Sequence, residues 1–310
     1  MAAPVVTPRT SAVPRPPVAD LPMLAVAVAA VSTSGPLMAS AAVTVPVLAI
    51  AMWRNALSLV VLGPATLLRR RSEVRALHPR ELRFAGTAGF FLALHFATWV
   101  PSLAMTSVAS ATALVATQPV WQAVIARLQG HHVSRQVWLG IALAVVGAGW
   151  LSGADFSVSS RSLRGDGLAA AAAVFAAVYI AAGGEVRRTV SSLTYTTFCY
   201  AVAALVLLAI CLVGDVRLGG WSAVSWWKLV AITAGAQLLG HSMFSLVLRT
   251  TSPTVVSLVI LLEVPGAAVL AWLWLGQVPR VSAIPGALLL LAGIAVVAVQ
   301  GVRAEEASPD

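Results

Sequence analysis

Charged residues are scarce in this chain. Aspartate, glutamate, lysine and arginine make up 10% of its 310 residues, whereas hydrophobic residues make up 59%. Soluble proteins carry roughly 25% charged residues. Because so few charges cannot cover a surface that faces water, the composition predicts an integral membrane protein. The net charge of +9 does not indicate nucleic-acid binding, because the arginines lie in short gaps between apolar segments rather than on one solvated face.

Cysteine is also rare, and the motifs of common enzymes are missing. Cys199 and Cys211 lie in one apolar segment, where a helix separates them by about 18 Å. That spacing excludes a disulfide within the helix, and two thiols do not make a metal site. The chain contains no HExxH, no GxSxG, no glycine loop for phosphates and no paired cysteine or histidine ligands. We therefore expect neither an enzyme nor a cofactor nor a metal.

Long apolar runs are abundant instead. Their usual length is about twenty residues, which is what a helix needs to cross a hydrocarbon core of about 30 Å. We expect an all-α integral membrane protein with ten transmembrane helices. Two spans each fall within 21–68 and 84–126, with turns near residues 44–46 and 105–107, and single spans fall at 137–153, 166–184, 192–213, 226–247, 254–275 and 282–301.

The apolar segments contain an internal repeat. A shift of 146 residues places His95 on His241 and Pro119 on Pro265. Three glycines also coincide: Gly130 with Gly276, Gly140 with Gly286, and Gly147 with Gly293. Chance matches in such a sequence would be alanine, leucine or valine, so one module occurs twice. Each copy holds an odd number of spans, so the two lie in opposite orientations. Secondary transporters have this architecture, with the solute site near midplane between the halves.

The repeat defines the expected domain organisation. We expect a disordered cytoplasmic tail (1–20), a first five-helix repeat (21–153), an inter-repeat loop (154–165), a second five-helix repeat (166–302) and a cytoplasmic tail (303–310). If both termini are cytoplasmic, the cytoplasmic segments carry fourteen arginines and the outer loops carry five lysines and arginines. Because cytoplasmic loops are enriched in these residues, we expect a multi-pass protein of the inner membrane with both termini inside.

Two charged residues fall inside expected spans. Glu263 lies about ten residues into its span, near the bilayer centre, where a charged side chain costs about 2.5–3.5 kcal/mol. It is either a group that couples transport to protons or solute, or a structural acid hydrogen-bonded to a neighbouring helix. Arg54 is the one intramembrane cation of the sequence. It could bind an anionic substrate, pair with Glu263, extend to the interface, or satisfy the carbonyls of a broken helix.

The other candidates for the solute site are residues that are uncharged at neutral pH and histidines, which titrate near neutral pH. His95 and His241 could carry a proton, but their equivalence in the repeat favours packing at the pseudo-twofold interface. Trp99 lies deeper than an interfacial tryptophan should. Gln118 and Tyr179 complete the set of residues expected to line the site.

Prolines and glycines mark breaks and close contacts. Pro36 interrupts the first span, and Pro119 and Pro265 are equivalent breaks in the two repeats. Freed carbonyls at such breaks commonly line a substrate cavity. For Pro36 a simple packing kink is an equal alternative, whereas symmetry favours a cavity role for the other two. The repeated glycines of spans five and ten favour close helix packing, either within the chain or in a homodimer.

Several of these residues resemble a known family. The stretch from Gly89 through His95 and Trp99 to Gln118 and Pro119 resembles spans three and four of bacterial EamA-type transporters of the drug/metabolite transporter superfamily. The second half resembles spans eight and nine of the same family, in Gly240–Phe244, Ser252–Ser257, Glu263 and Leu273–Gly276. Arg54, Tyr179 and Tyr200 also stand where the family often has an arginine and tyrosines. The resemblance covers about residues 21–302.

The chain departs from the family pattern at two places. Val264 separates Glu263 from Pro265, where the family usually has Glu-Pro. The acids that usually follow Leu-Gly at the ends of spans four and nine are replaced by His131 and Gln277. Glu263 is therefore the one acid expected deep in the bundle.

The resemblance implies a carrier that works by alternating access and typically exports its solute. Our working hypothesis is a secondary transporter that exports a small metabolite, amino acid or drug, with proton coupling through Glu263. The expected partners are this solute, protons and membrane lipid, without nucleic acid. Two other functions stay open: a non-transporting assembly or sensory subunit, and a membrane enzyme that uses Glu263 and His241 as acid and base. The sequence offers no nucleophile for the enzyme.

Overall fold

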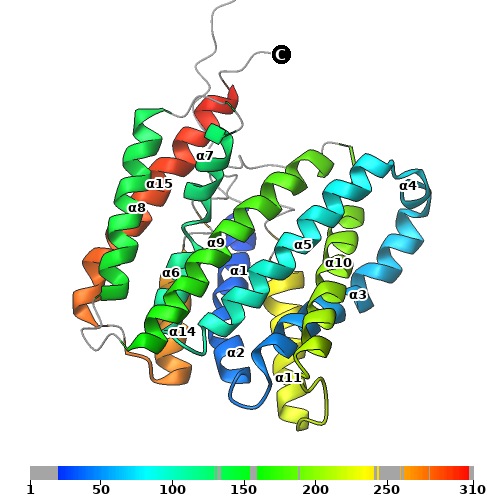
Figure 1. Ribbon diagram of the computed structural model, residues 1–310, viewed down its shortest axis with the longest axis horizontal. Coiled ribbons are helices and arrows are strands. Elements are labelled where there is room, and N and C mark those ends of the chain that lie inside the picture. The colour runs from blue at the N-terminus through cyan, green and yellow to red at the C-terminus, as the bar shows by residue number, and fades with distance from the viewer. Residues whose placement is uncertain are drawn as a thin grey trace, which may run out of the picture.

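The computed structural model describes residues 20–128, 130, 134–153, 159–187, 189–240, 243, 259, 262–278 and 280–306. Every regular element in this part of the chain is a helix (Figure 1). The first repeat contains α1 (Asp20–Ser32), α2 (Ser34–Ala41), α3 (Val47–Arg69), α4 (Arg71–Ala76), α5 (Pro79–Ser102), α6 (Val108–Val115), α7 (Gln118–Leu128) and α8 (Arg135–Gly153). The second contains α9 (Ser160–Arg187), α10 (Ser192–Val213), α11 (Ala223–Ile232), the π-helix η1 (Thr233–Gly240), α14 (Glu263–Leu275), the 3-10 turn η2 (Val281–Ala283) and α15 (Ile284–Glu306).

Six helical segments of the described residues are long and apolar enough to cross a membrane. They are Leu21–Ala41, Val47–Arg69, Pro79–Ser102, Val108–Ile125, Ser160–Arg187 and Ser192–Val213. Shorter apolar helices follow at Arg135–Gly147, Glu263–Leu275 and Val281–Val296. The protein is therefore a multi-pass membrane protein, and the count of ten spans stays a prediction.

Capping side chains, as well as hydrophobicity, determine where the helices begin and end. The span expected at 192–213 coincides with α10, and the turns expected near 44–46 and 105–107 separate α2 from α3 and α5 from α6. In contrast, α9 begins at Ser160 rather than at 166, because the hydroxyl of Ser159 accepts a hydrogen bond from the Ser162 backbone amide (3.1 Å). Such a cap starts a helix among polar residues, so a helix extends beyond its apolar part.

Two spans of the first repeat are interrupted next to a proline. The first span breaks at Thr33, between α1 and α2, and the fourth breaks between α6 and α7. Pro36 and Pro119 then lie in the first turn of α2 and of α7, where a helix does not need the missing amide hydrogen. Pro265 occupies the same position in α14 as Pro36 does in α2. Most residues just before α14 lie outside the described part.

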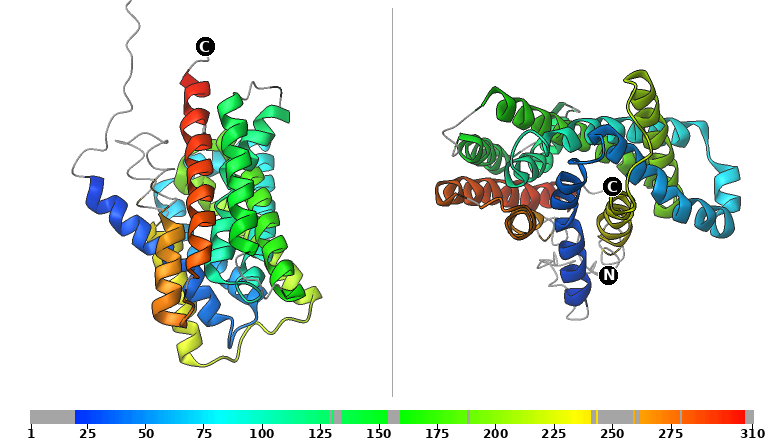
Figure 2. Two further views of the ribbon diagram at one scale, coloured as in Figure 1. Left: turned by 90° about the vertical axis from the view of Figure 1, so that its left-hand side faces the viewer. Right: turned by 90° about the horizontal axis from the view of Figure 1, so that it is seen from below.

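The equivalent helices α8 and α15 form a reciprocal contact. A Cβ atom added to Gly147 would lie 2.7 Å from the Gly286 carbonyl oxygen, and one added to Gly293 would lie 2.5 Å from that of Gly140. Because the later residue of each helix meets the earlier residue of the other, the two helices run antiparallel (Figures 1 and 2). The 146-residue shift places Gly140 on Gly286 and Gly147 on Gly293. The contact of Gly147 with Gly286 is therefore the counterpart of the contact of Gly293 with Gly140. Inverted repeats require such an antiparallel, reciprocal contact between equivalent helices. The repeated glycines of α8 and α15 therefore pack against each other within the chain.

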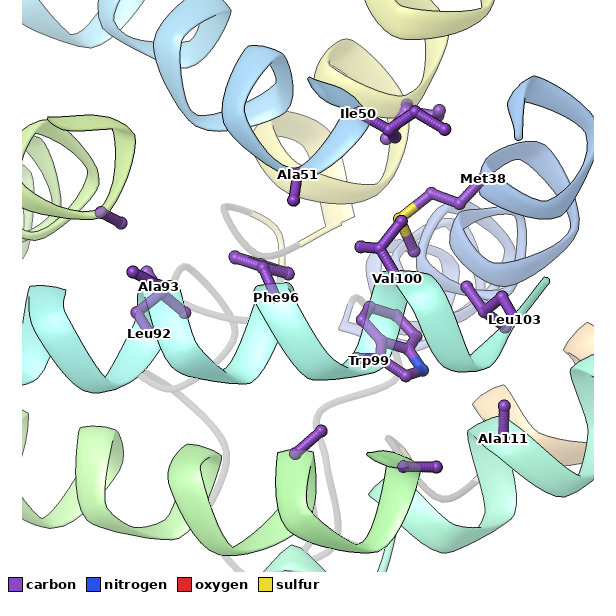
Figure 3. Packing of buried hydrophobic residues seen from close by; sticks show 14 of the residues in the cluster. Met38, Ile50, Ala51, Leu92, Ala93, Phe96, Trp99, Val100, Leu103 and Ala111 are labelled. Atoms are coloured by element: carbon purple, nitrogen blue, oxygen red, sulfur yellow. The ribbon is translucent and has the colours of Figure 1, made fainter. Parts of the chain in front are cut away.

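Helices of the two repeats also pack together in the centre of the molecule. A Cβ atom on Gly89 of α5 would lie 2.7 Å from the Cys199 carbonyl oxygen of α10, so these helices touch backbone to backbone. Figure 3 shows the apolar core beside this crossing, where α5 faces α2 and α3. The side chains labelled there are Met38, Ile50, Ala51, Leu92, Ala93, Phe96, Trp99, Val100, Leu103 and Ala111.

Carboxylates near α4 tie the two repeats together. The Glu73 carboxylate accepts hydrogen bonds from the Ser191 backbone amide, the Ser191 hydroxyl (2.8 Å) and the Thr194 hydroxyl (3.1 Å). It therefore caps the N-terminus of α10, where a negative charge is favourable. The Glu81 carboxylate accepts a bond from the Thr189 hydroxyl (2.5 Å). The connection from α3 to α5 is thus bonded to the connection from α9 to α10.

The Glu73 cap predicts a pH-dependent stability. Burial alone would raise the pKa of Glu73, but the hydrogen bonds from Ser191 and Thr194 lower it below its ordinary value of 4.5. A carboxyl with a depressed folded-state pKa stabilises the fold above its unfolded-state pKa and loses this effect as pH falls through the folded-state pKa. We expect Glu73→Gln to lower stability by about 1 kcal/mol at pH 7, since the site is partly exposed.

Thermal unfolding of the detergent-purified protein between about pH 7 and about pH 3 measures this effect. The difference between wild type and Glu73→Gln should shrink at the acid end. Asp215→Asn removes an exposed acid after α10 and serves as the control. A constant difference across the range would show that the Glu73 charge does not stabilise the fold.

Candidate functional site

Arg54 is the most deeply buried charged residue of the described part, with 2% of its surface exposed. It lies on α3, and its Nε donates a hydrogen bond to Oε1 of Gln237 (2.6 Å). The guanidinium stacks over the Phe96 ring of α5, 4.3 Å from the ring centre. Nη1 makes longer contacts with the hydroxyl of Ser34 (3.5 Å) and the sulfur of Met38 (3.3 Å), both on α2. The cation on α3 thus contacts side chains from three other helices, η1, α5 and α2.

Gln237 is positioned by an uncommon backbone conformation. It lies in the π-helix η1, and π-helical turns often occur at functional sites. Its Nε2 donates to Oδ1 of Asn55 (3.5 Å), so its Oε1 faces Arg54. The Tyr200 hydroxyl lies within hydrogen-bonding reach of the same amide. Arg54 and Tyr200 occupy equivalent positions under the 146-residue shift, so the two repeats meet at Gln237.

The charge of Arg54 is not neutralised by a direct ion pair. Among the described residues, no carboxylate lies within ion-pair distance of the guanidinium. Glu263 is close enough to interact with it electrostatically at longer range. Glu263 is the first residue of α14 and is partly buried, and a carboxylate is favourable at this end of a helix. Arg54 and Glu263 thus share one region without forming the pair that one interpretation of the sequence suggested.

The break between α1 and α2 lies beside this cluster and is enclosed by both repeats. A Cβ atom on Gly35 of α2 would lie 3.3 Å from the Thr112 hydroxyl of α6. One on Gly266, in the first turn of α14, would lie 2.9 Å from Cβ of Ser32. One on Gly235 of η1 would lie 3.8 Å from the Thr33 hydroxyl. Glycines therefore allow three helices to approach the break closely.

Three buried polar atoms, two beside the break and one on α5, have no hydrogen-bond partner among the described residues. They are Oγ of Ser32, Oγ1 of Thr112 and Nε1 of Trp99. Trp99 is 5% exposed and follows Phe96 by one turn of α5. Buried polar groups are nearly always hydrogen-bonded in folded proteins. These atoms are therefore suited to bind the polar groups of a solute.

Of the remaining predicted residues, His95 lies beside the site, since its ring centre is 4.9 Å from that of Phe96 and 5.5 Å from that of Trp99. Nδ1 of His95 donates to the Ala172 carbonyl oxygen of α9 (2.9 Å), which is the interhelical packing that the repeat favoured. Tyr179 bonds to Tyr195 between α9 and α10, and Gln118 begins α7. Within the described residues neither side chain bonds to Arg54. His241 lies outside the described part.

Comparison with protein families decides the class of this molecule. The model of the EamA-like transporter family matches residues 21–153 and again residues 163–299. The chain belongs to the EamA-like transporter family. The two matches correspond to the two repeats, so the Arg54 cluster of this EamA-like protein is built where its repeats meet.

Solved structures share the fold of this EamA-like protein, and one of them covers nearly its whole length. It is described only as "Crystal structure of protein", with a TM-score of 0.61 and 20% sequence identity over 92% of this chain and 98% of that chain. No curated protein matches the sequence. Family membership shows a membrane transporter of the drug/metabolite transporter superfamily, and members of this family are transporters rather than enzymes.

Proposed function

We propose that this EamA-like protein is a secondary transporter that exports a small metabolite, amino acid or drug across the bacterial inner membrane by alternating access. The solute binds beside the break between α1 and α2. The observation that supports this most strongly is the burial of Arg54 among neutral partners from both repeats. A buried charge costs free energy unless it is compensated, so such a residue is retained where it has a use.

Each part of the site has a role in this proposal. Arg54 supplies a positive charge for an anionic group of the solute, and Gln237 holds the guanidinium in one orientation. Nε1 of Trp99 and Oγ1 of Thr112, which have no hydrogen-bond partner in the described part of the chain, bind further polar groups of the solute. The ring of Phe96 adds an apolar surface that is already covered on one side by Arg54. A solute with a polar or anionic head and an apolar body fits this lining.

Glu263 is the proposed proton site. Its ionisation changes the net charge near Arg54 by one unit, and the two groups interact electrostatically. Protonation therefore alters the affinity of the site for a charged solute, which is the requirement for coupling two ligands.

The Glu263→Gln variant tests the coupling. Proteoliposomes are loaded with a mixture of metabolites and antibiotics, a pH gradient is imposed, and released solutes are identified by mass spectrometry. We expect the gradient to accelerate release by the wild type and to have no effect on release by Glu263→Gln. Glu185→Gln, which removes an exposed acid, should respond as the wild type does. If Glu263→Gln keeps the full response to the gradient, Glu263 does not couple protons to transport.

A further inference from the structure

Arginines are concentrated where α3 turns into α5. Six exposed arginines lie within residues 69–83, which we name the arginine elbow: Arg69, Arg70, Arg71, Arg75, Arg80 and Arg83. The segment includes the short helix α4, which lies at the periphery of the helix bundle in perpendicular views (Figures 1 and 2). On α4, Arg71 and Arg75 are separated by four residues and so share one face of the helix.

The acids of the elbow are bonded elsewhere. Its two carboxylates, Glu73 and Glu81, accept hydrogen bonds from the connection between α9 and α10 and from the first turn of α10. Within the elbow, an ion pair joins Arg70 to Glu73 at 3.9 Å, and the Arg70 side chain is still 52% exposed. The protein therefore compensates only a small part of the positive charge that the elbow presents.

Exposed leucines adjoin the arginines. Leu67 and Leu68, in the last turn of α3, are 61% and 84% exposed, and Leu82, in the first turn of α5, is 42% exposed. A soluble anion would leave these side chains uncovered. A phospholipid would cover them with its acyl chains while its phosphate contacts the arginines. The combination thus favours a lipid over a free phosphate as the occupant.

We propose that the arginine elbow is a binding site for the headgroups of anionic phospholipids in the leaflet that it faces. Guanidinium groups bind phosphate oxygens through two parallel hydrogen bonds. Clusters of four to eight basic residues at the end of a membrane span attract anionic lipids, and each residue contributes separately. Arg71 and Arg75 provide the two phosphate contacts on α4, and Leu67 and Leu68 lie against the acyl chains.

Native mass spectrometry of the detergent-purified protein tests the proposal. The protein is titrated with phosphatidylglycerol and with phosphatidylcholine of the same acyl chains. We expect the wild type to prefer phosphatidylglycerol. The double variant Arg71→Gln/Arg75→Gln should lose this preference by roughly tenfold. Its thermal unfolding should stay unchanged, because both side chains are exposed.

The control removes the same charge at another place. Arg127→Gln/Arg135→Gln replaces two exposed arginines at the ends of α7 and α8 and should keep the wild-type preference. An equal loss in both double variants would show a general effect of charge and overturn the proposal. No preference in the wild type would overturn it as well. Displacement of the lipid by an equal concentration of inorganic phosphate would assign the site to a soluble anion instead.

Discussion

Replacing Arg54 by alanine is expected to reduce solute transport by roughly tenfold or more. The guanidinium is buried and donates to Gln237, and a hydrogen bond with a charged group contributes about 1.5–3 kcal/mol. A solute anion would lose this interaction, and each 1.4 kcal/mol corresponds to a factor of ten. Arg54→Lys should restore part of the rate, because it keeps the charge but loses the planar donor fork that contacts Gln237. Release from loaded proteoliposomes measures the rates.

A purely structural role of Arg54 predicts a different result. Truncation would then lower stability and transport together, because the amide of Gln237 would lose its buried partner. Thermal unfolding with and without the transported solute separates the two roles. We expect the solute to stabilise the wild type but not Arg54→Ala. The control Arg187→Ala, at the exposed end of α9, should keep both transport and stabilisation. Equal stabilisation of wild type and Arg54→Ala by the solute would contradict the assigned role.

Alanine at Gly147 or at Gly293 is expected to disrupt the packing of α8 against α15. The added Cβ would meet backbone atoms of the other helix, at 2.7 Å and 2.5 Å from carbonyl oxygens, and a backbone cannot move aside as a side chain can. Overpacking of this kind costs about 1–3 kcal/mol. Because the two contacts are equivalent, each variant should lower the unfolding temperature by a similar amount.

A control variant and a double variant test whether the helices cross at these glycines. Gly86→Ala places the same methyl group on α5 where no atom of another described element lies within 4 Å, so its stability should be unchanged or higher, since alanine favours helices. The double variant Gly147→Ala/Gly293→Ala should cost less than the two single changes together, because one methyl group already separates the helices. Strict additivity, or wild-type stability of Gly147→Ala, would show that the helices do not cross at these glycines.

Much of the helix arrangement could be predicted from the sequence, because membrane crossing leaves a strong pattern. Apolar runs without charge located α10 to the residue and both turns of the first four spans. Matches at proline and glycine revealed the repeat because such residues rarely coincide by chance in an apolar chain. The Ser159 hydroxyl caps α9 at Ser160, six residues before its apolar segment begins, so hydropathy alone misplaced that end.

The site was predicted less completely. A charge in an apolar run is visible in the sequence, so Arg54 and Glu263 stood out as candidates, and their roles stay predictions. Gln237 and Asn55 were missed, because one sequence does not show which face a helix turns toward its neighbours. The π-helix that positions Gln237 has no sequence signal of its own. His95 bonds to the Ala172 carbonyl oxygen of α9, as the packing interpretation expects, and its part in transport stays a prediction.

The most direct test of the central claim is solute release from proteoliposomes that contain either the wild type or Arg54→Ala. The vesicles hold the mixture of metabolites and antibiotics, and mass spectrometry identifies what leaves them. If the solute binds at Arg54 between the repeats, the wild type releases at least one compound faster than protein-free vesicles do, and Arg54→Ala does not. Release of that compound by Arg54→Ala at the wild-type rate, or no release by the wild type, would contradict the claim.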